Sequence, residues 1–533
     1  MTAKKLPEPR NMPEERATFY VTTPIYYVND RPHIGHVYTT TLADVVARYH
    51  RLRGDDTFFL TGTDEHAAKV VDAAREHDLT PREWAQRNAD EFRRTFARLA
   101  IRNDDFVRTS EPRHADTVSG YVRDLIESGN VYQGEYEGWY DAGQEEYVPE
   151  TKARDAEYRS VITGKPLLRK REKNYFFRLS DYADRLLELI ESGDFRVRPD
   201  ARRNEVVARI REGLNDVPIS RTGTEGWGIP IPGDPEQTIY VWIDALFSYL
   251  STVDTPARRR FWPAQVHLIG KEILWFHAVI WPALLLALGR SLPEGVYAHS
   301  FWIREGQKMS KSLGNFVDLE EVDDYVARFG VDALRYYLVT QGPLGTSDAD
   351  FAASKFIEVY NADLANTLGN SFSRVAAMTA RYFDGVLPAS VDRAASTARW
   401  EPIVERCLAD YAAAMDELRL EGAAAAGLEL VREVDGYIER TQPFRVARDP
   451  ARRGEVATIL YACNEALRIA SVLLWPIMPE RTAELWTRIG KEEYSETLAD
   501  AGTDRLREWT RWGGLKSGTE IRQADALFPR YSG

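Results

Sequence analysis

Two short segments, far apart along the chain, carry side chains that could bind a triphosphate. One is His33-Ile34-Gly35-His36 and the other is Lys308-Met309-Ser310-Lys311-Ser312. Imidazole and ammonium groups offer two kinds of positive charge, and preplaced cations stabilise the negative charge that develops on departing pyrophosphate. Either segment alone could arise by chance. Together they predict an enzyme that activates a carboxylate with ATP.

The histidine segment is predicted at the junction between a strand and a helix. Residues 18–23 are β-branched or aromatic, as in a buried strand, and the breakers that follow include Pro24 and Pro32. Apolar residues then recur at nearly helical spacing up to Gly54, a suitable C-terminal cap. The histidines would therefore lie at a helix N-terminus, which attracts phosphate oxygens. Gly35 has no side chain, so a base or sugar could approach the backbone there.

The lysine segment is predicted to be a mobile loop. Gly306 precedes it, Gly314 follows it, and it contains small hydroxyl residues. Lys308 and Lys311 could close on the β- and γ-phosphates as charge moves toward pyrophosphate. Most Lys-x-x-Lys strings are solvated basic loops, and two histidines at a helix start can be ordinary residues. Only the presence of both segments favours a nucleotide site.

The order of the remaining patterns predicts an α/β protein followed by a helical region. Strand and helix patterns alternate from Thr18 to about Phe106, which is typical of a doubly wound parallel sheet. The stretch 118–229 breaks this alternation and is predicted to be an insertion. The sheet is expected to resume with two strands and a helix, at Thr238–Trp242, Val266–Ile269 and Glu272–Leu288. From Ala353 to about Ile489 the pattern predicts a helical bundle.

Composition is that of a large soluble enzyme. The 533 residues are too many for one core, and the net charge of -13 argues against a generally basic surface but allows a local nucleic-acid contact face. The two cysteines, Cys407 and Cys463, indicate no disulfide framework and are expected to be small buried side chains. Residues 1–16 contain no apolar leader, and the most apolar run, Ile273–Leu288, is shorter than the ~20 residues that span a bilayer. We therefore expect a cytoplasmic protein with no membrane partner.

Four longer strings and a short tail match one known family. They are Thr23-Pro24-Ile25-Tyr26-Tyr27-Val28-Asn29, Leu60-Thr61-Gly62-Thr63-Asp64-Glu65-His66, Tyr240-Val241-Trp242-Ile243-Asp244-Ala245, His267-Leu268-Ile269-Gly270-Lys271-Glu272-Ile273 and Leu527-Phe528-Pro529-Arg530. Over nearly its whole length the chain resembles the methionyl-tRNA synthetases, a family of class I aminoacyl-tRNA synthetases. The four long strings are specific, whereas the tail is weak alone.

The resemblance implies a doubly wound Rossmann-like catalytic domain with an inserted connective domain, followed by an all-α anticodon-binding bundle. The implied divisions are 14–117 and 230–300 for the two catalytic halves, 118–229 for the connective insertion, 301–352 for the lysine loop and stem-contact region, 353–490 for the bundle, and 491–533 for a C-terminal tail. The implied reaction joins L-methionine to tRNA(Met) through methionyl-adenylate, consuming ATP with Mg2+ and releasing AMP and pyrophosphate.

The resemblance also implies the site residues. The ATP-binding residues would be His33, Gly35, His36, Lys308, Met309, Ser310, Lys311 and Ser312, of which His33, His36, Lys308 and Lys311 would be catalytic. The methionine-binding residues would be Ile25, Tyr27, Asp64, Trp242, Tyr249, Ile273 and His277. Asp64 would hold the α-amino group, while the aromatic residues would select the uncharged, polarizable thioether by shape and sulfur contact.

In the family, the bundle binds the anticodon. Asn366, Asn370 and Arg374 recur four residues apart, so they share one helix face and could contact base edges. The family usually has Pro-Trp at a later helix start, where this chain has Pro443-Phe444. Phe444 could stack on a base or lie in the core, and the sequence leaves both alternatives open.

Two further features bear on metal and assembly. Many relatives bind zinc through Cys-x-x-Cys knuckles in the insertion, but the corresponding stretch here, Gly138–Tyr147, contains neither cysteine nor histidine. We therefore predict no zinc, as in the branch of the family that lacks these cysteines. Nothing after the bundle resembles a dimerising barrel, so a monomer is expected.

Three alternative functions remain open on sequence alone. A class I synthetase for another apolar amino acid would share both ATP segments but have a different pocket. A non-catalytic tRNA-binding relative would usually have lost an ATP segment, and both are intact. A nicotinamide oxidoreductase would need Gly-x-Gly-x-x-Gly after the first strand, which this chain lacks.

Overall fold

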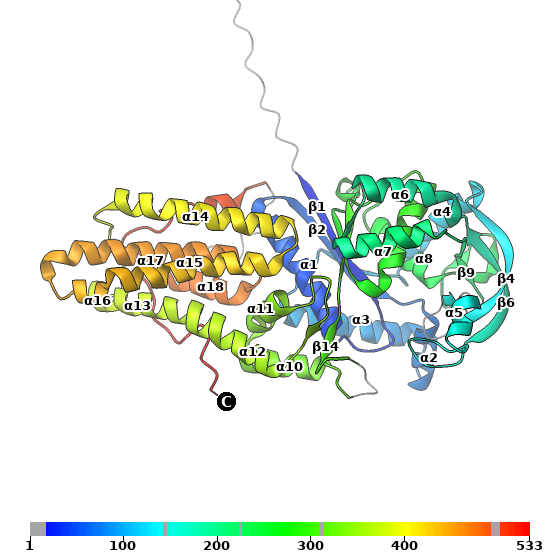
Figure 1. Cartoon of the computed structure of the whole chain (residues 1–533), viewed down its shortest axis with the longest axis horizontal. Coiled ribbons are helices and arrows are strands. Elements are labelled where there is room, and N and C mark those ends of the chain that lie inside the picture. The colour runs from blue at the N-terminus through cyan, green and yellow to red at the C-terminus, as the bar shows by residue number, and fades with distance from the viewer. Residues whose placement is uncertain are drawn as a thin grey trace, which may run out of the picture.

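The computed structural model describes residues 17–141, 146–148, 150–222, 226–309, 314–491 and 502–532. An α/β lobe lies at one end of the elongated molecule and a helical lobe at the other, with helix α1 (Ile34–Arg53) near their junction (Figure 1).

A parallel six-stranded sheet forms the centre of the α/β lobe. Its strand order is β3-β2-β1-β12-β13-β7, and each neighbouring pair is parallel. The strands are β1 (Thr18–Tyr27), β2 (Asp56–Asp64), β3 (Asp105–Arg108), β7 (Arg196–Arg198), β12 (Val266–Gly270) and β13 (Gly295–His299). The predicted doubly wound parallel sheet is confirmed. Helices α2 (Ala68–Glu76), α3 (Pro81–Arg98), α4 (Pro112–Glu127), α8 (Val241–Ser251) and α9 (Trp281–Ala287) accompany it.

The first strand and helix form where the sequence predicts them. Strand β1 is longer than residues 18–23, because it passes through the breaker Pro24 with a register shift between Thr22 and Ile25. Helix α1 ends at Gly54, whose φ of 90° favours glycine.

The second half of the lobe differs from the prediction in one element. The expected strand Thr238–Trp242 is wrong: β11 (Asp234–Ile239) ends earlier, in a small antiparallel sheet with β9 (Ser220–Arg221) and β10 (Pro230–Ile231), and α8 begins at Val241. The predicted helix from Glu272 is present, but it includes a π-helical turn at Phe276–Ile280 before α9.

The stretch 118–229 forms mostly a separate antiparallel sheet of order β5-β4-β6-β8. Its strands are β4 (Val131–Asp141), β5 (Glu146–Val148), β6 (Leu168–Phe177) and β8 (Val217–Pro218), and its helices are α5 (Glu150–Asp155), α6 (Ala183–Ser192) and α7 (Asp200–Arg211). This stretch also supplies β7, which pairs with β13 at the edge of the main sheet.

A connecting region leads to the helical lobe. It contains strands β14 (Trp302–Arg304), β15 (Gln307–Lys308) and β16 (Ala349–Asp350) and helices α10 (Leu319–Phe329) and α11 (Val331–Gln341). The bundle comprises α12 (Ala353–Val359), a π-helical segment (Tyr360–Gly369), α13 (Asn370–Phe383), α14 (Arg393–Asp416), α15 (Leu420–Thr441), α16 (Pro443–Val446), α17 (Arg453–Leu474) and α18 (Pro479–Arg488). A short helix, α19 (Arg505–Trp509), follows.

Helix α17 is the core helix of the bundle. The helical run Pro450–Leu474 is long and apolar enough to cross a membrane by composition, but 94% of its apolar window is buried by the rest of the protein. Cys463 on this helix and Cys407 on α14 are both buried free thiols, as predicted.

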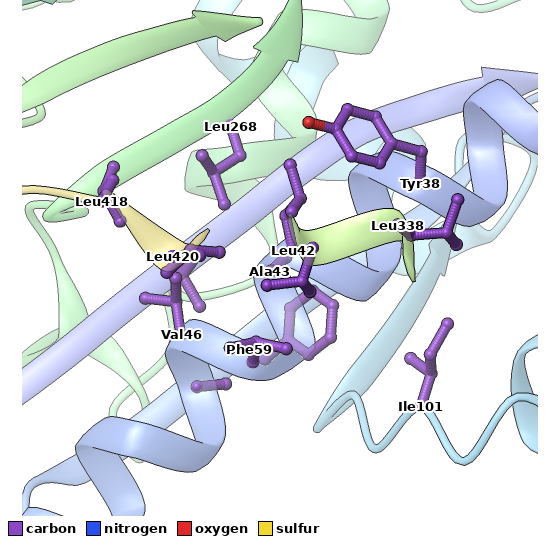
Figure 2. Close-up of a cluster of buried hydrophobic side chains, with 14 of the residues drawn as sticks. Tyr38, Leu42, Ala43, Val46, Phe59, Ile101, Leu268, Leu338, Leu418 and Leu420 are labelled. Carbon is purple, nitrogen blue, oxygen red and sulfur yellow. The ribbon is translucent and has the colours of Figure 1, made fainter. Parts of the chain in front are cut away.

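One apolar core continues from the sheet into the bundle. Side chains of α1, among them Leu42 and Val46, lie near Leu338 of α11 and near Leu418 and Leu420 at the start of α15 (Figure 2). The helix that begins at the two histidines is therefore packed against both lobes.

A buried charge cluster reinforces this junction. Arg335 on α11 donates to the carbonyl of Ile477 (2.9 Å), to the carbonyl of Leu99 (3.1 Å) and to Asp44 Oδ2 (2.7 Å). Asp44, on α1, also accepts from Arg48 Nε at 2.6 Å. Arg335 and Asp44 are both 0% exposed, so these bonds form away from solvent.

Asp332 is a second buried carboxyl in this region. Its Oδ2 accepts from the backbone N–H of Arg481, and its Oδ1 has no hydrogen-bond partner in the described part of the chain. Burial raises the pKa of Asp332 to about 7, although nearby arginines oppose the shift.

Replacing Asp332 by asparagine is expected to stabilise the fold more at high pH than at low pH. Between the ordinary pKa of 3.8 and about 7, the folded carboxyl keeps a proton that the unfolded chain releases, so the wild type loses stability as pH rises. Because asparagine does not ionise, its advantage in the free energy of unfolding should grow by about 2–3 kcal/mol between about pH 5 and about pH 8. Urea unfolding of both proteins at the two pH values measures this difference, and equal pH slopes would contradict it.

Candidate active site

Twelve of the predicted ATP and methionine residues line one cleft at the carboxyl ends of β1, β2, β12 and β13. This is where open parallel sheets bind ligands, and the cleft has a volume of about 1080 Å³. The predicted residues that line it are Ile25, Tyr27, His33, Gly35, His36, Asp64, Trp242, Tyr249, Ile273, His277, Lys308 and Met309. The other three predicted ATP residues, Ser310, Lys311 and Ser312, lie outside the described residues.

The two histidines cap the N-terminus of α1 reciprocally. His33 is the N-cap residue, and its Nδ1 accepts from the Gly35 N–H at 3.0 Å. His36 Nδ1 accepts from the His33 N–H at 3.2 Å, and the two rings lie 3.8 Å apart between centroids. Since a backbone N–H can only donate, Nδ1 is unprotonated in both rings.

Burial then fixes the charge of these rings. It lowers the pKa of His33 to about 4, and burial together with the neighbouring His33 lowers the pKa of His36 well below its ordinary value. Both imidazoles are therefore neutral near pH 7 and carry their proton on Nε2. The expectation that they supply positive charge is wrong for the protein in this state, where they are oriented hydrogen-bond donors.

The chain that follows the lysine segment lies beside this histidine turn. The Ile34 N–H donates to the Val317 carbonyl at 3.3 Å. The ring of Phe316 meets the His33 ring edge-on, with 4.9 Å between centroids. Segments separated by almost 300 residues thus form one wall of the cleft, as a shared nucleotide site requires.

A hydrogen bond also joins Lys308, at the start of the lysine segment, to the chain just after that segment. Asn315 Nδ2 donates to the Lys308 carbonyl at 3.2 Å, across the residues that are not described. Two ammonium groups lie near the Phe301 ring. The distance to the ring centre is 5.6 Å for Lys308 and 4.5 Å for Lys271. Lys271 is paired with Asp348 at 2.6 Å, whereas Lys308 is exposed at the cleft.

Aromatic residues form the other end of the cleft. The Trp242 ring stacks on Phe276, with centroids 4.0 Å apart and planes inclined by 12°, and meets Tyr27 edge-on at 6.0 Å. Asp64, at the end of β2, is opposite Tyr27 in the strand register and is 2% exposed. A carboxylate therefore lies close to an apolar, polarizable pocket.

The hydrogen-bond direction between Tyr249 and His277 can be assigned. His277 Nδ1 lies 3.0 Å from the Ile273 carbonyl, which can only accept, so Nδ1 carries the proton. Burial lowers the pKa of His277 to about 4, so the ring is neutral and Nε2 is an acceptor. The Tyr249 hydroxyl, 2.8 Å away, therefore donates to Nε2.

Sequence reasoning missed several residues of this cleft. Phe276, Glu272, His299 and Phe316 all line it. Glu272 belongs to one of the strings that match the family, but its side chain was assigned no role. Phe276 and His299 had no motif signal, because one lies in an apolar helix and the other ends a strand that was not predicted.

The predicted anticodon residues lie on the bundle. Asn366 and Asn370 are exposed, and Arg374 is partly buried with its guanidinium 3.6 Å from Asp435. Phe444 is 44% exposed on α16, so the core alternative for this residue is wrong. Val446 of α16 shares an apolar cluster with Val456 and Leu460 of α17, and Met378, Tyr382 and Phe383 of α13 border that cluster.

Within the described ranges, no group of three or more His, Cys, Asp or Glu side chains is placed to hold a metal ion. Residues 142–145 of the stretch considered for zinc are not described. The absence of zinc stays a prediction.

Comparison with known families gives two matches. Residues 19–156 and 151–376 match the family described as tRNA synthetases class I (M). Residues 404–508 match the family described as anticodon-binding domain of tRNA ligase.

Individual proteins agree with these families. The chain is 41% identical over 526 residues to a methionine–tRNA ligase of Streptomyces coelicolor, covering 96% of both chains. It is 38% identical to that of Bacillus subtilis, covering 97% of this chain and 79% of the relative. The solved Mycobacterium tuberculosis methionyl-tRNA synthetase in complex with methionyl-adenylate superposes with a TM-score of 0.87 at 34% identity, covering 96% of this chain and 100% of that one. On the matched families, the near full-length relatives and the cleft, this chain belongs to the methionyl-tRNA synthetases.

Proposed function

We propose that this cleft carries out both steps of ATP-dependent methionine–tRNA ligation. In the first, a carboxylate oxygen of methionine attacks the α-phosphorus of ATP, the bond to the β-phosphate breaks, and pyrophosphate leaves. In the second, a hydroxyl of the terminal ribose of tRNA(Met) attacks the carbonyl carbon of methionyl-adenylate and AMP leaves. The observation that supports this proposal is that His33, His36 and Lys308 line one cleft, where the chain after the lysine segment meets the histidine turn through Ile34 and Val317.

The roles of the nucleotide residues follow from their hydrogen bonds and charges. His33 and His36 donate from Nε2 to phosphate oxygens, and Lys308 and Lys311 neutralise the pyrophosphate that leaves. Mg2+ enters as part of the substrate, bound to ATP, and screens the same charge. No protein nucleophile is required, because positioning of the carboxylate and ATP accounts for the chemistry.

The methionine site combines one charge with a shaped apolar pocket. Asp64 binds the α-ammonium group, which fixes the carboxylate toward ATP. Trp242, Tyr27 and Tyr249 contact the side chain with Ile25, Ile273 and His277, and sulfur–aromatic contacts favour the thioether. On the bundle, Asn366, Asn370, Arg374 and the exposed Phe444 contact the anticodon, the first three at base edges and Phe444 by stacking.

ATP–pyrophosphate exchange across a panel of amino acids tests this proposal. Exchange should depend on methionine and be near background with leucine, isoleucine and valine. A preference for another apolar amino acid would support a synthetase of different specificity. Absence of exchange with every amino acid, from a folded protein that still binds tRNA, would support a non-catalytic relative. A monomer in the cytoplasm stays our expectation, and light scattering of the purified chain measures the assembly.

Replacing Tyr249 by phenylalanine is expected to raise the KM for methionine by about three- to tenfold, because His277 Nε2 loses its donor and the pocket wall loses its fixed ring orientation. The KM for ATP should change little. Methionine-dependent exchange measures both constants. Tyr121→Phe is a matched control, since the Tyr121 hydroxyl donates to Asp254 and Tyr121 does not line the cleft. Equal effects of the two variants would contradict a specific role for Tyr249.

A further inference from the structure

A buried carboxylate beside the cleft is shared by two histidines. Asp244 Oδ2 accepts from His66 Nδ1 at 2.7 Å, and Asp244 Oδ1 accepts from His114 Nε2 at 2.7 Å. The His114 Nδ1 lies 2.8 Å from the Ser251 hydroxyl. Burial raises the pKa of Asp244, but the two histidines outweigh it and bring the pKa to about 2, so the carboxylate is charged.

The chain Ser251–His114–Asp244 has the residue types of a hydrolytic triad, but it lacks access to a substrate. Ser251 is 8% exposed, His114 and Asp244 are each 1% exposed, and none of the three lines the cleft. A nucleophile must reach its substrate, so this geometry does not fit nucleophilic catalysis. Its bonds instead connect three separate elements.

Those elements carry the two ends of the proposed methionine site. His66 comes two residues after Asp64, at the end of β2, and Asp244 comes two residues after Trp242, in the first turn of α8. His114 lies in α4, which packs on α8. One carboxylate thus ties the strand end that presents Asp64 to the helix that presents Trp242.

Glu65, between Asp64 and His66, is also held by hydrogen bonds. The Glu65 carboxylate accepts from Arg108 Nε at 2.7 Å, and the Glu65 carbonyl accepts from the Trp227 indole. The His66 ring meets Trp227 edge-on with centroids 5.4 Å apart. Asp64 is consequently held on one side by the β3 strand and on the other by α8.

We propose that Asp244 is a positioning residue that fixes Asp64 relative to Trp242, so that one amino acid can satisfy the carboxylate and the aromatic pocket together. This inference rests on the proposed function, because it assigns Asp64 to the α-ammonium group. Asp244 acts through His66 and touches no substrate. A ligand that uses only the aromatic pocket does not need this spacing, whereas a ligand that uses both ends does.

Replacing Asp244 by asparagine should therefore raise the KM for methionine by about tenfold or more and leave the KM for ATP within about twofold, because the amide has one oxygen and cannot accept from both histidines. Competitive inhibition supplies the readout that a general loss of structure would not give. Inhibition by L-methioninol, which has the amino group, should weaken by a similar factor. Inhibition by 4-(methylthio)butan-1-ol, which lacks it, should be unchanged.

Asp332→Asn is the matched control, since Asp332 is also a buried aspartate and lies outside the cleft.

Two variants of His66 test the positioning role of Asp244 if Asp244→Asn does not fold. His66→Ala should raise the KM for methionine, and His66→Asn should restore it, because the asparagine amide can donate to Asp244 from nearly the position of Nδ1.

The outcomes separate the two claims. A wild-type protein without methionine-dependent exchange would overturn the proposed function. A wild-type protein with that exchange, but with Asp244→Asn and His66→Ala both keeping the wild-type KM for methionine, would overturn the positioning role. Equal weakening of the two alcohols would also overturn it, since the effect would then not depend on the amino group.

Discussion

Replacing His36 by alanine is expected to slow methionine-dependent ATP–pyrophosphate exchange by about 10²–10³-fold, the usual cost of removing one oriented donor to developing charge. The His36 ring is held by the His33 N–H on Nδ1, so its Nε2–H is aimed before ATP binds. A donor that needs no reorientation acts chiefly on kcat, because the departing pyrophosphate carries more negative charge in the transition state than it does in bound ATP. The KM for methionine should change little.

The control for this variant lies on the same helix. His50 is also a histidine of α1 whose pKa is lowered by burial, but it pairs with Asp55 in the last turn, about 20 Å from His36 along the helix axis. Replacing His50 by alanine disturbs α1 without touching the cleft and should leave exchange within about threefold of wild type. His36→Gln keeps an N–H donor and should recover part of the rate. Exchange by His36→Ala within that same range would refute the role of the imidazole.

The local patterns around the histidine segment were sufficient to predict its setting. A β-branched strand, a run of breakers and a helical repeat ending in glycine place His33 and His36 at a helix start, and β1 and α1 have this form. The charge state was not predictable in this way. The charge state depends on how much water the folded cleft leaves around each ring. That is set in part by Phe92 and Phe316, which are distant in sequence from the histidines and belong to no quoted string.

The incorrect strand at Thr238–Trp242 shows where periodicity is uninformative. Helix α8 is almost entirely buried, so its apolar residues surround the whole helix and give no one-sided repeat. The β-branched and aromatic start of that run resembles a strand as much as a helix. Strand β7 was missed for a different reason: it is three residues long, Arg196-Val197-Arg198, and only its pairing with β13 makes it a strand.

The resemblance identified site residues that no local pattern could connect. Asp64, Trp242 and His277 are far apart in sequence, and their convergence depends on the parallel order of β1, β2 and β12. Among the residues that hold Asp64 and Trp242, His66 and Asp244 were inside the quoted strings but had no assigned role, and His114 lay outside those strings. Their function becomes visible only when both carboxylate oxygens of Asp244 are seen to be occupied.

The junction between the lobes leads to the prediction with the largest expected effect on stability. Replacing Arg335 by methionine is expected to lower the free energy of unfolding by about 3–5 kcal/mol, as when one member of a buried ion cluster is removed. Methionine fills a similar volume but donates no hydrogen bond, so the carbonyls of Leu99, Pro476 and Ile477 each lose a donor inside the protein. Asp44 still accepts hydrogen bonds from Arg48 and from the Arg102 N–H, which limits the loss of stability.

Arg75→Met is the matched control, because Arg75 pairs with Asp72 on the surface at 3.2 Å, with the two side chains 60% and 70% exposed. An exposed pair contributes about 0–1 kcal/mol, so this variant should unfold at nearly the wild-type urea concentration. A double variant of Arg335→Met with Asp44→Asn should lose less stability than the sum of the two single variants, because the charges depend on one another.

Arg335 bonds to the chain between α17 and α18 and to Asp44 of α1. Its loss should therefore also separate unfolding of the bundle from unfolding of the sheet. Fluorescence and circular dichroism would then report different midpoints, and a single unshifted transition would show that the cluster does not join the lobes.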